Sequence, residues 1–217
     1  NATPEAKKKA ENLAKLDEQL GRQKESAGYY EAQKLLDSGK AAEAGAAFEK
    51  FAEGNKTHPD APNALYNAGV AWEKANDMKK AIAVRERLIK EHPDAKVAPQ
   101  ALLALAGAQS KKNKDHAGAA KHYVHYLEKW PAGDHRCLAL QNLAYEYDEL
   151  KKKEDAAKNY RTFGTDEKCA KEDPNSAAKA LYRAGALYSG ANKKGDAKDA
   201  WTAMSKLGGV TDAVAKS

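Results

Sequence analysis

The sequence predicts an all-α protein that consists of about five repeated helix pairs and an additional N-terminal helix. Three observations lead to this prediction. Alanine dominates the 42% hydrophobic fraction, and isoleucine occurs only at Ile82 and Ile89, so residues that favour strands are scarce. Large hydrophobic residues recur at the three- and four-residue spacing of one helix face. One pattern of small residues also returns at a nearly constant interval along the chain.

Paired small residues define this interval. Five small residues are each followed twelve positions later by an alanine, in the pairs Ala32 and Ala44, Gly69 and Ala81, Gly107 and Ala119, Ala144 and Ala156, and Gly185 and Ala197. The pairs recur every 37, 38, 37 and 41 residues. Small residues let two helices approach closely, and no single pair can bury its apolar face alone. Each copy is therefore predicted to be a helix, a turn and a helix, stacked on its neighbours.

The predicted elements follow in order from the N-terminus. Residues 1–26 are predicted to form a helix, since Ala6, Ala10, Leu13, Leu16 and Leu20 have helical spacing. This helix is either a cap or the second half of a preceding repeat. A repeat domain covers residues 27–207, in units of about 27–60, 61–98, 99–135, 136–175 and 176–207. A C-terminal tail, residues 208–217, completes the chain.

Turn-forming residues lie where the two helices of a pair must be joined. They are Asp37-Ser38-Gly39, Asn76-Asp77, Lys112-Asn113-Lys114 and Lys194-Gly195-Asp196. Prolines separate the units at His58-Pro59, His92-Pro93, Trp130-Pro131 and Asp173-Pro174. Because proline ends one helix and starts the connection to the next, these positions support the unit boundaries.

Larger residues recur around the small ones. Leu65, Leu103, Leu140 and Leu181 lie four residues before the first small residue, and Phe48, Arg85, Tyr123, Tyr160 and Trp201 lie four residues after the alanine. This combination resembles the tetratricopeptide repeat (TPR) family, over about residues 28 to 207. The resemblance implies a right-handed α-α superhelical solenoid. Arg85 and Ser110 depart from the family pattern, since each replaces an aromatic residue.

The units are longer than the family's period of ~34 residues. In this they resemble the repeats of bacterial envelope proteins such as the Tol-Pal-associated cell-division coordinator and the outer-membrane assembly lipoprotein. The resemblance implies a non-catalytic scaffold that binds a partner peptide or helix in a concave groove, as a periplasmic adaptor in an envelope or motility complex. The alternatives are a cytoplasmic location, a regulatory TPR domain of a larger enzyme or signalling protein, and a structural oligomerisation module.

In TPR arrays the first helices line the groove. By resemblance, the groove residues here are Asn63, Tyr66, Val70, Glu73, Ala101, Ala104, Ala108, Gln141, Tyr145, Asp148, Lys179, Tyr182 and Ala186. The three tyrosines are the leading candidates, because tyrosine offers a large contact area with a polar tip; packing between helices is the alternative for them.

One TPR subtype clamps a C-terminal carboxylate of its partner with Lys and Asn residues. Asn142, Lys179 and Arg183 occupy matching positions here. Ala104 and Ala108, however, stand where the first Lys and Asn of the clamp should be. Lys179 and Arg183 could instead pair with acidic groups of a partner.

Cys137 and Cys169 are the only cysteines. In the TPR-like arrangement, Cys137 opens the first helix of the fourth unit and Cys169 lies just beyond its second helix. An antiparallel helix pair brings those ends together, so the geometry allows a disulfide. Such a bond would contribute roughly 3 to 4 kcal/mol in the chain-entropy model and would indicate an oxidising compartment. Two free thiols in a cytosolic protein are the alternative.

The composition argues against several other classes. The net charge of +6 and the pI near 9.0 come from 37 basic and 31 acidic residues that alternate along the chain, which favours a solvated helical surface over nucleic-acid binding. No stretch approaches the ~20 apolar residues of a membrane-spanning helix; association with a membrane through a complex stays open.

His122 and His125 share a helix face, but no recognised metal-ligand spacing surrounds them. We therefore expect no metal, no cofactor and no enzymatic activity. The chain starts at Asn1 without a methionine, so we expect that a preceding part was removed, either as a signal sequence or by the design of the expressed protein.

Overall fold

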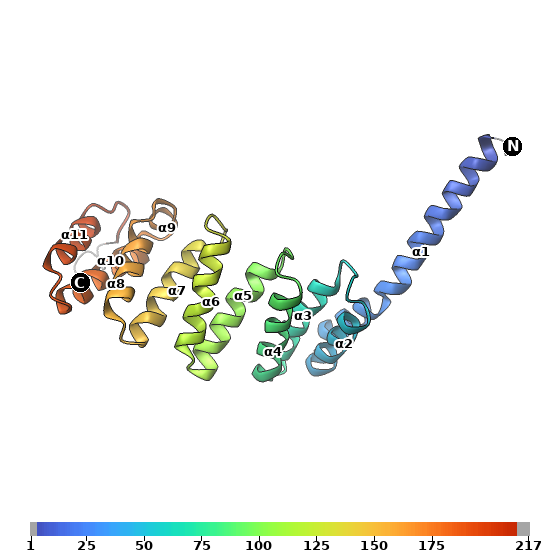
Figure 1. Ribbon diagram of the computed structural model, residues 1–217, viewed down its shortest axis with the longest axis horizontal. Helices are drawn as coiled ribbons and strands as arrows, with labels where there is room; N and C mark the ends of the chain where they lie inside the picture. Colours follow the sequence, from blue (N-terminus) through green and yellow to red (C-terminus); the bar gives the residue numbers. More distant parts are fainter. Residues whose placement is uncertain (1–3, 212–217) are drawn as a thin grey trace. The chain divides into compact units, whose positions relative to one another are not determined.

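The structure is a computed structural model that describes residues 4–211, apart from the side chains of residues 5, 6, 10, 11, 17–25, 112 and 113 (Figure 1). The described residues form helices and no strands, which confirms the predicted all-α class. In chain order the helices are α1 (Pro4–Asp37), α2 (Ala41–Gly54), α3 (Ala61–Lys74), α4 (Met78–Glu91), α5 (Ala98–Ala108), the π-helix η1 (Gln109–Asn113), α6 (His116–Lys129), α7 (Arg136–Glu149), α8 (Lys153–Thr165), α9 (Glu167–Glu172), α10 (Pro174–Gly190) and α11 (Lys194–Ser205).

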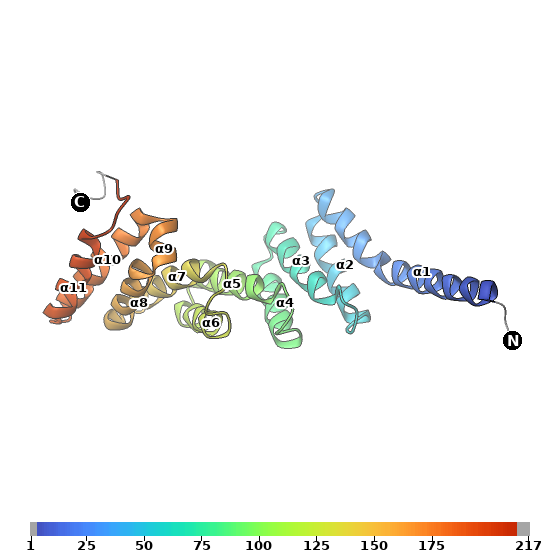
Figure 2. The same cartoon turned by 90° about the horizontal axis from the view of Figure 1, so that it is seen from above.

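The chain divides into two compact units, an N-terminal unit of Asn1–Ala101 and a C-terminal unit of Leu102–Ser217. Within the N-terminal unit, α1 packs against α2, α2 against α3, and α3 against α4. Within the C-terminal unit, α6, α7, α8, α10 and α11 pack in the same sequential way, and the short α9 contacts both α8 and α10 (Figure 2). This nearest-neighbour packing is that of a helical repeat solenoid.

The twelve-residue spacing arises from a contact inside each pair. A Cβ atom added at Gly69 would lie 3.2 Å from the side chain of Arg85 in the second helix. At Gly185, the indole of Trp201 fills the space that a Cβ atom would occupy. In these two pairs, the small residue of the first helix therefore lies directly beneath the large residue that follows the alanine of the second helix.

A second close contact joins successive pairs. A Cβ atom at Gly45 of α2 would lie 2.7 Å from the indole of Trp72 in α3, and one at Gly164 of α8 would lie 2.5 Å from Leu181 Cγ in α10. Each contact holds the second helix of one pair against the first helix of the next. The two kinds of contact alternate, which explains why a pair needs its neighbours to complete its interior.

The turn within each pair contains one residue with a left-handed backbone conformation. These residues are Gly39 (φ 79°), Asn76 (φ 60°), Lys114 (φ 54°), Lys151 (φ 58°) and Asn192 (φ 59°), and they recur at the same 37, 38, 37 and 41 residues as the small-residue pairs. The turn predicted at residues 194–196 is wrong, because α11 already begins at Lys194. Asp196 lies in the first turn of α11, where an acidic side chain stabilises the helix N-terminus.

Helix α1 has no break at residue 26, where the predicted N-terminal helix was to end. The predicted extra helix and the first helix of the first pair are one continuous helix, whose N-terminal part extends beyond α2 (Figures 1 and 2). Its C-terminal part is anchored by Tyr29, whose ring contacts Phe48 and Phe51 edge-on at centroid distances of 5.4 and 5.7 Å. No described helix combines the length and the apolarity that crossing a bilayer requires.

Candidate partner-binding surface

The first helices of the C-terminal unit present large hydrophobic side chains to solvent. Leu138 and Tyr145 on α7 are each 47% exposed, and Tyr182 on α10 is 53% exposed. A separation of seven residues places Leu138 and Tyr145 on the same face of α7. Because these side chains stay about half exposed in the folded unit, a gathering of them indicates a surface that binds another molecule.

A pocket of about 530 Å³, which we call pocket A, opens beside this face between α5, η1, α6 and α7. The buried Tyr123 of α6 contributes to it from the second helix of the third pair. Leu103 of α5 and Leu138 and Tyr145 of α7 give it apolar walls, while Lys111 and Lys114 supply positive charge on the η1 side. Pocket A is thus apolar on the α7 side and cationic on the η1 side.

A hydrogen-bonded pair of side chains, Glu146 and His116, lies in the lining of pocket A. Glu146 is only 2% exposed, and its Oε2 lies 2.7 Å from Nδ1 of His116. The His116 ring also contacts the ring of Tyr145 edge-on, at a centroid distance of 6.2 Å. The hydrogen bond satisfies one oxygen of the buried carboxyl group, and the ring contact holds Tyr145 beside the pocket. Lys111 and Lys114 form no ion pair with any residue that the structure describes.

A smaller pocket of about 250 Å³, which we call pocket B, lies on the other side of α7. Gln141 of α7, Tyr160 of α8, and Lys179 and Arg183 of α10 line it. The Arg183 guanidinium donates two hydrogen bonds to the Asp148 carboxylate, at 2.8 and 2.9 Å. In the described part of the chain Lys179 has no ion-pair partner. Pocket B therefore offers one fixed and one available positive charge.

Pockets A and B occupy equivalent positions in successive pairs. Leu138 and Lys179 each lie six residues before the small residue of their pair, and Asn142 and Arg183 each lie two residues before it. The two tyrosines of the second helices are equivalent in the same way. These two repeat positions thus contribute an aliphatic and a neutral polar side chain to pocket A, but two cationic side chains to pocket B.

The tyrosines of the two pockets stay protonated at neutral pH. Burial raises the pKa of Tyr123 to about 12, and the nearby charge of Glu146 adds to this effect. Burial also raises the pKa of Tyr160 to about 12, with the charge of Asp148 as the next cause. Each phenol can therefore act as a hydrogen-bond donor and acceptor.

The three residues that match the carboxylate clamp do not meet in one pocket. Asn142 lines pocket A, whereas Lys179 and Arg183 line pocket B. Arg183 is also already engaged by Asp148. The arrangement does not form a single site for one carboxylate.

The predicted groove residues of the N-terminal unit are less available. Asn63, Tyr66 and Val70 of α3 are half-buried. The carboxylate of Glu73 accepts hydrogen bonds from Arg85, with NH1–Oε1 and NH2–Oε2 distances of 2.9 and 2.7 Å. Arg85 is itself 1% exposed, so the ion pair uses Glu73 to compensate a buried charge.

Two predicted groove residues are wrong, because Ala101 and Ala108 are buried. Conversely, three residues of this surface were not predicted from the sequence: Leu138, His116 and Glu146. The position of Leu138 carries a signal, since it is equivalent to that of Lys179 in the following pair. No sequence signal pairs His116 with Glu146, which lie 30 residues apart.

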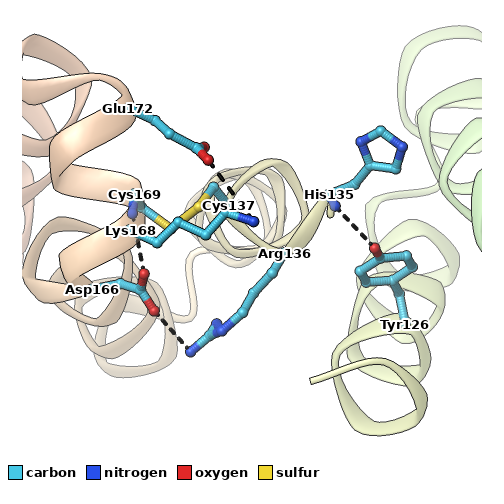
Figure 3. Close-up of a disulfide and its surroundings, with 8 residues drawn as sticks. All are labelled: Tyr126, His135, Arg136, Cys137, Asp166, Lys168, Cys169 and Glu172. Carbon is cyan, nitrogen blue, oxygen red and sulfur yellow. Dashed lines mark hydrogen bonds and ion pairs between the residues drawn. A yellow bond between two sulfur atoms is a disulfide. The ribbon is translucent and has the colours of Figure 1, made fainter. Parts of the chain in front are cut away.

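The structure contains a disulfide between Cys137 and Cys169, with a Cα–Cα distance of 5.3 Å (Figure 3). Asp166 caps α9 by accepting a hydrogen bond from the backbone N–H of Cys169 at 3.1 Å, and it pairs with Arg136 at 3.1 Å. Figure 3 shows these contacts side by side at the start of α7. A covalent bond and an ion pair thus fix the end of α7 that carries Leu138.

Comparison with known proteins identifies the fold only. No protein-family model matches the chain, and no curated protein matches it. Among solved structures, MamA residues 41 to the end from Desulfovibrio magneticus RS-1 is 20% identical with a TM-score of 0.56, covering 85% of this chain and 94% of that one. MamA of AMB-1 is 14% identical with a TM-score of 0.60, covering 89% and 97%. A putative kinesin light chain with TPR-like repeats from Podosopora anserina is 12% identical with a TM-score of 0.55, covering 86% and 95%. The fold is therefore that of a TPR-like helical solenoid.

Proposed function

We propose that the protein is a non-catalytic scaffold that binds a segment of a partner protein on the exposed face of α7 and α10. The observation that carries this proposal is the exposure of three large side chains on these first helices: Leu138 and Tyr145 of α7, which line pocket A, and Tyr182 of α10. Covering such side chains removes apolar area from water, and tyrosine is among the residues that dominate binding energies.

The proposal extends to an adaptor role in a periplasmic envelope or motility complex of a bacterium. Two observations support it: repeats of 37 to 41 residues resemble those of envelope proteins, and a disulfide links Cys137 to Cys169. Structural disulfides persist in oxidising compartments and are rare in the cytosol. Alkylation of the native host's protein with a maleimide mass tag, after denaturation without reductant, tests the location. Tagging of both cysteines before reduction would contradict a periplasmic site.

Affinity capture from host extract tests the binding face. We expect the variant Tyr145→Ala/Tyr182→Ala to capture at least about tenfold less partner than the wild type, because two aromatic contacts each contribute more than about 1 kcal/mol. Tyr30→Ala is the matched control, since Tyr30 is a 60% exposed tyrosine on α1 of the other unit. Tyr66→Ala tests the half-buried tyrosine of α3 separately. Equal capture by the double variant and the wild type would refute the proposed face.

A second candidate function, self-association, has one specific observation in its favour. Leu13 and Leu16 of α1 are about half exposed. A second copy of this helix could cover both leucines as in a coiled coil. Sedimentation velocity at several concentrations tests this: a dimer that Leu13→Asp/Leu16→Asp abolishes would support it, and a monomeric wild type would exclude it.

A further inference from the structure

We infer that pockets A and B bind one extended acidic peptide, with a bulky apolar side chain in pocket A and a carboxylate side chain in pocket B, three or four residues apart. This inference rests on the proposed function and specifies the chemistry of the partner. It follows from the lining, the charge and the spacing of the two pockets.

The apolar side chain belongs in pocket A. Pocket A is about twice as large as pocket B, at about 530 against 250 Å³. Leu103, Leu138 and Tyr145 form its apolar part, and two of these side chains are still half exposed. A bulky aliphatic or aromatic side chain inserted there would cover the exposed apolar area.

The carboxylate belongs in pocket B. The equivalent of Leu138 there is Lys179, whose ammonium group has no ion-pair partner among the described residues, and Arg183 lies beside it. Arg183 is neutralised by Asp148, so Lys179 is the group that a ligand can pair with. A carboxylate of the peptide would gain a charge-assisted hydrogen bond from it.

The charge around both pockets also favours an acidic peptide. Lys111, Lys114 and Lys179 carry positive charge in the two linings without an ion-pair partner in the described chain. The acidic residue in these linings, Glu146, is buried and paired with His116. The unpaired charge in the two linings is therefore positive, which favours an acidic segment there. The exposed Glu149 of α7 lies near them, since its charge raises the pKa of Tyr145.

The spacing follows from the helix that separates the pockets. Both pockets are lined by α7, with Asn142 and Tyr145 in pocket A and Gln141 in pocket B. A helix with its side chains is about 10–12 Å wide, and an extended peptide advances about 3.1–3.4 Å per residue. Three or four residues therefore span α7. One or two residues are too short, and a helical ligand would need about seven at about 1.5 Å each.

A series of synthetic peptides tests this geometry on the full chain. Each fluorescein-labelled peptide carries one Phe and one Glu in a Ser/Gly background, at separations of one to seven residues, with acetylated and amidated ends. We expect the Kd from fluorescence anisotropy to be about tenfold lower at separations of three or four than at one, two or seven, since only these place both groups at once. The absence of a free terminal carboxylate excludes clamp binding as the cause.

A charge exchange tests the assignment of pocket B. Lys179→Glu is expected to weaken the best Phe/Glu peptide about tenfold and to strengthen the matching Phe/Lys peptide, because a like charge replaces an opposite one. Lys158→Glu, an exposed lysine of α8 outside both linings, is the matched control and should change neither affinity. Leu138→Ala should weaken the Phe contact and leave the preference for Glu over Lys unchanged. Circular dichroism melts verify that each variant folds.

Three results would overturn the inference: affinity independent of separation, a preference for seven residues, or an unchanged Glu preference in Lys179→Glu. If no peptide binds while partner capture still depends on Tyr145 and Tyr182, the two-pocket geometry is wrong and the proposed function stands. If capture is independent of both tyrosines, the proposed function itself is wrong.

Discussion

The two units are built from the same helix pair but differ in what their first helices leave available. In the N-terminal unit, Glu73 is held by the buried Arg85 and Tyr66 is half-buried. In the C-terminal unit, the positions of the second helices that correspond to Arg85 carry Tyr123, Tyr160 and Trp201, which are uncharged and need no carboxylate from the first helices. Leu138 and Tyr145 stay exposed there. The repeat therefore supplies the fold in both units, and the proposed binding face lies where the first helices do not have to neutralise a buried arginine of the second helix.

The largest expected effect concerns the disulfide of the C-terminal unit. Cys137→Ser/Cys169→Ser should lower the free energy of unfolding by about 3–4 kcal/mol, because the bond closes a loop of 32 residues in the unfolded chain. Urea denaturation followed by circular dichroism measures it. Reductant should lower the stability of the wild type by a similar amount and leave the double variant unchanged. Equal stability of wild type and variant without reductant would show that the bond contributes nothing.

The next effect concerns the ion pair of the N-terminal unit. Glu73→Ala should cost about 1–3 kcal/mol, since it leaves the buried guanidinium of Arg85 without its hydrogen-bond partner. Adding Arg85→Met should recover most of this loss, because methionine keeps an unbranched stem over Gly69 and removes the charge. Thermal and urea unfolding of the single and double variants measure both changes. A double variant as unstable as Glu73→Ala would contradict the ion-pair explanation.

Glycine substitutions separate close contacts from open positions. Gly164→Ala should cost about 1–3 kcal/mol, because the new Cβ atom would lie 2.5 Å from Leu181 Cγ and 2.9 Å from the backbone oxygen of Ala177. At Gly195 nothing lies within 4 Å, so Gly195→Ala should be neutral or stabilise by up to about 1 kcal/mol. Denaturant midpoints compare the two variants. A harmless Gly164→Ala would contradict the close packing between pairs.

The smallest effect is the pH dependence of the C-terminal unit. The pKa of Tyr123 is raised to about 12 in the folded state, against about 10 in the unfolded state. The unfolded chain therefore loses the phenolic proton first, and the stabilisation that is complete below pH 10 is lost as the pH rises towards 12. Tyr123→Phe should reduce this decline in urea midpoints measured between pH 8 and 11. An equal decline in the variant would assign it to other groups.

The helix pairs could be predicted from the sequence because the twelve-residue spacing of their small residues reflects a steric requirement. A large residue such as Trp201 needs a small one beneath it, and the positions of Gly185 and Ala197 record this in the sequence. The turn before α11 was misplaced because Gly195 and Asp196 have turn propensity, yet the short turn was already complete at Asn192. Local propensity does not decide between two neighbouring positions that both favour a turn.

The candidate surface was only partly predictable. The repeat register predicts the positions of Tyr145 and Tyr182. It does not predict whether a first-helix residue is exposed or buried, and Ala108 is buried. Arg183 and Asp148, which form an ion pair, lie 35 residues apart in the sequence. His116 and Glu146, which form a hydrogen bond, lie 30 residues apart. Such pairs depend on how successive helices pack, which a single sequence does not encode in a recognisable pattern.

Site-specific photo-crosslinking distinguishes the two faces most directly. Benzoylphenylalanine would replace Leu138 or Tyr182 in the C-terminal unit, or Tyr66 in the N-terminal unit, and the crosslinked partner would be quantified after irradiation. The structure predicts strong crosslinks from positions 138 and 182 and at most weak ones from position 66, where the side chain is half-buried. Strong crosslinking from position 66 with none from 138 and 182 would contradict the assignment of partner binding to α7 and α10.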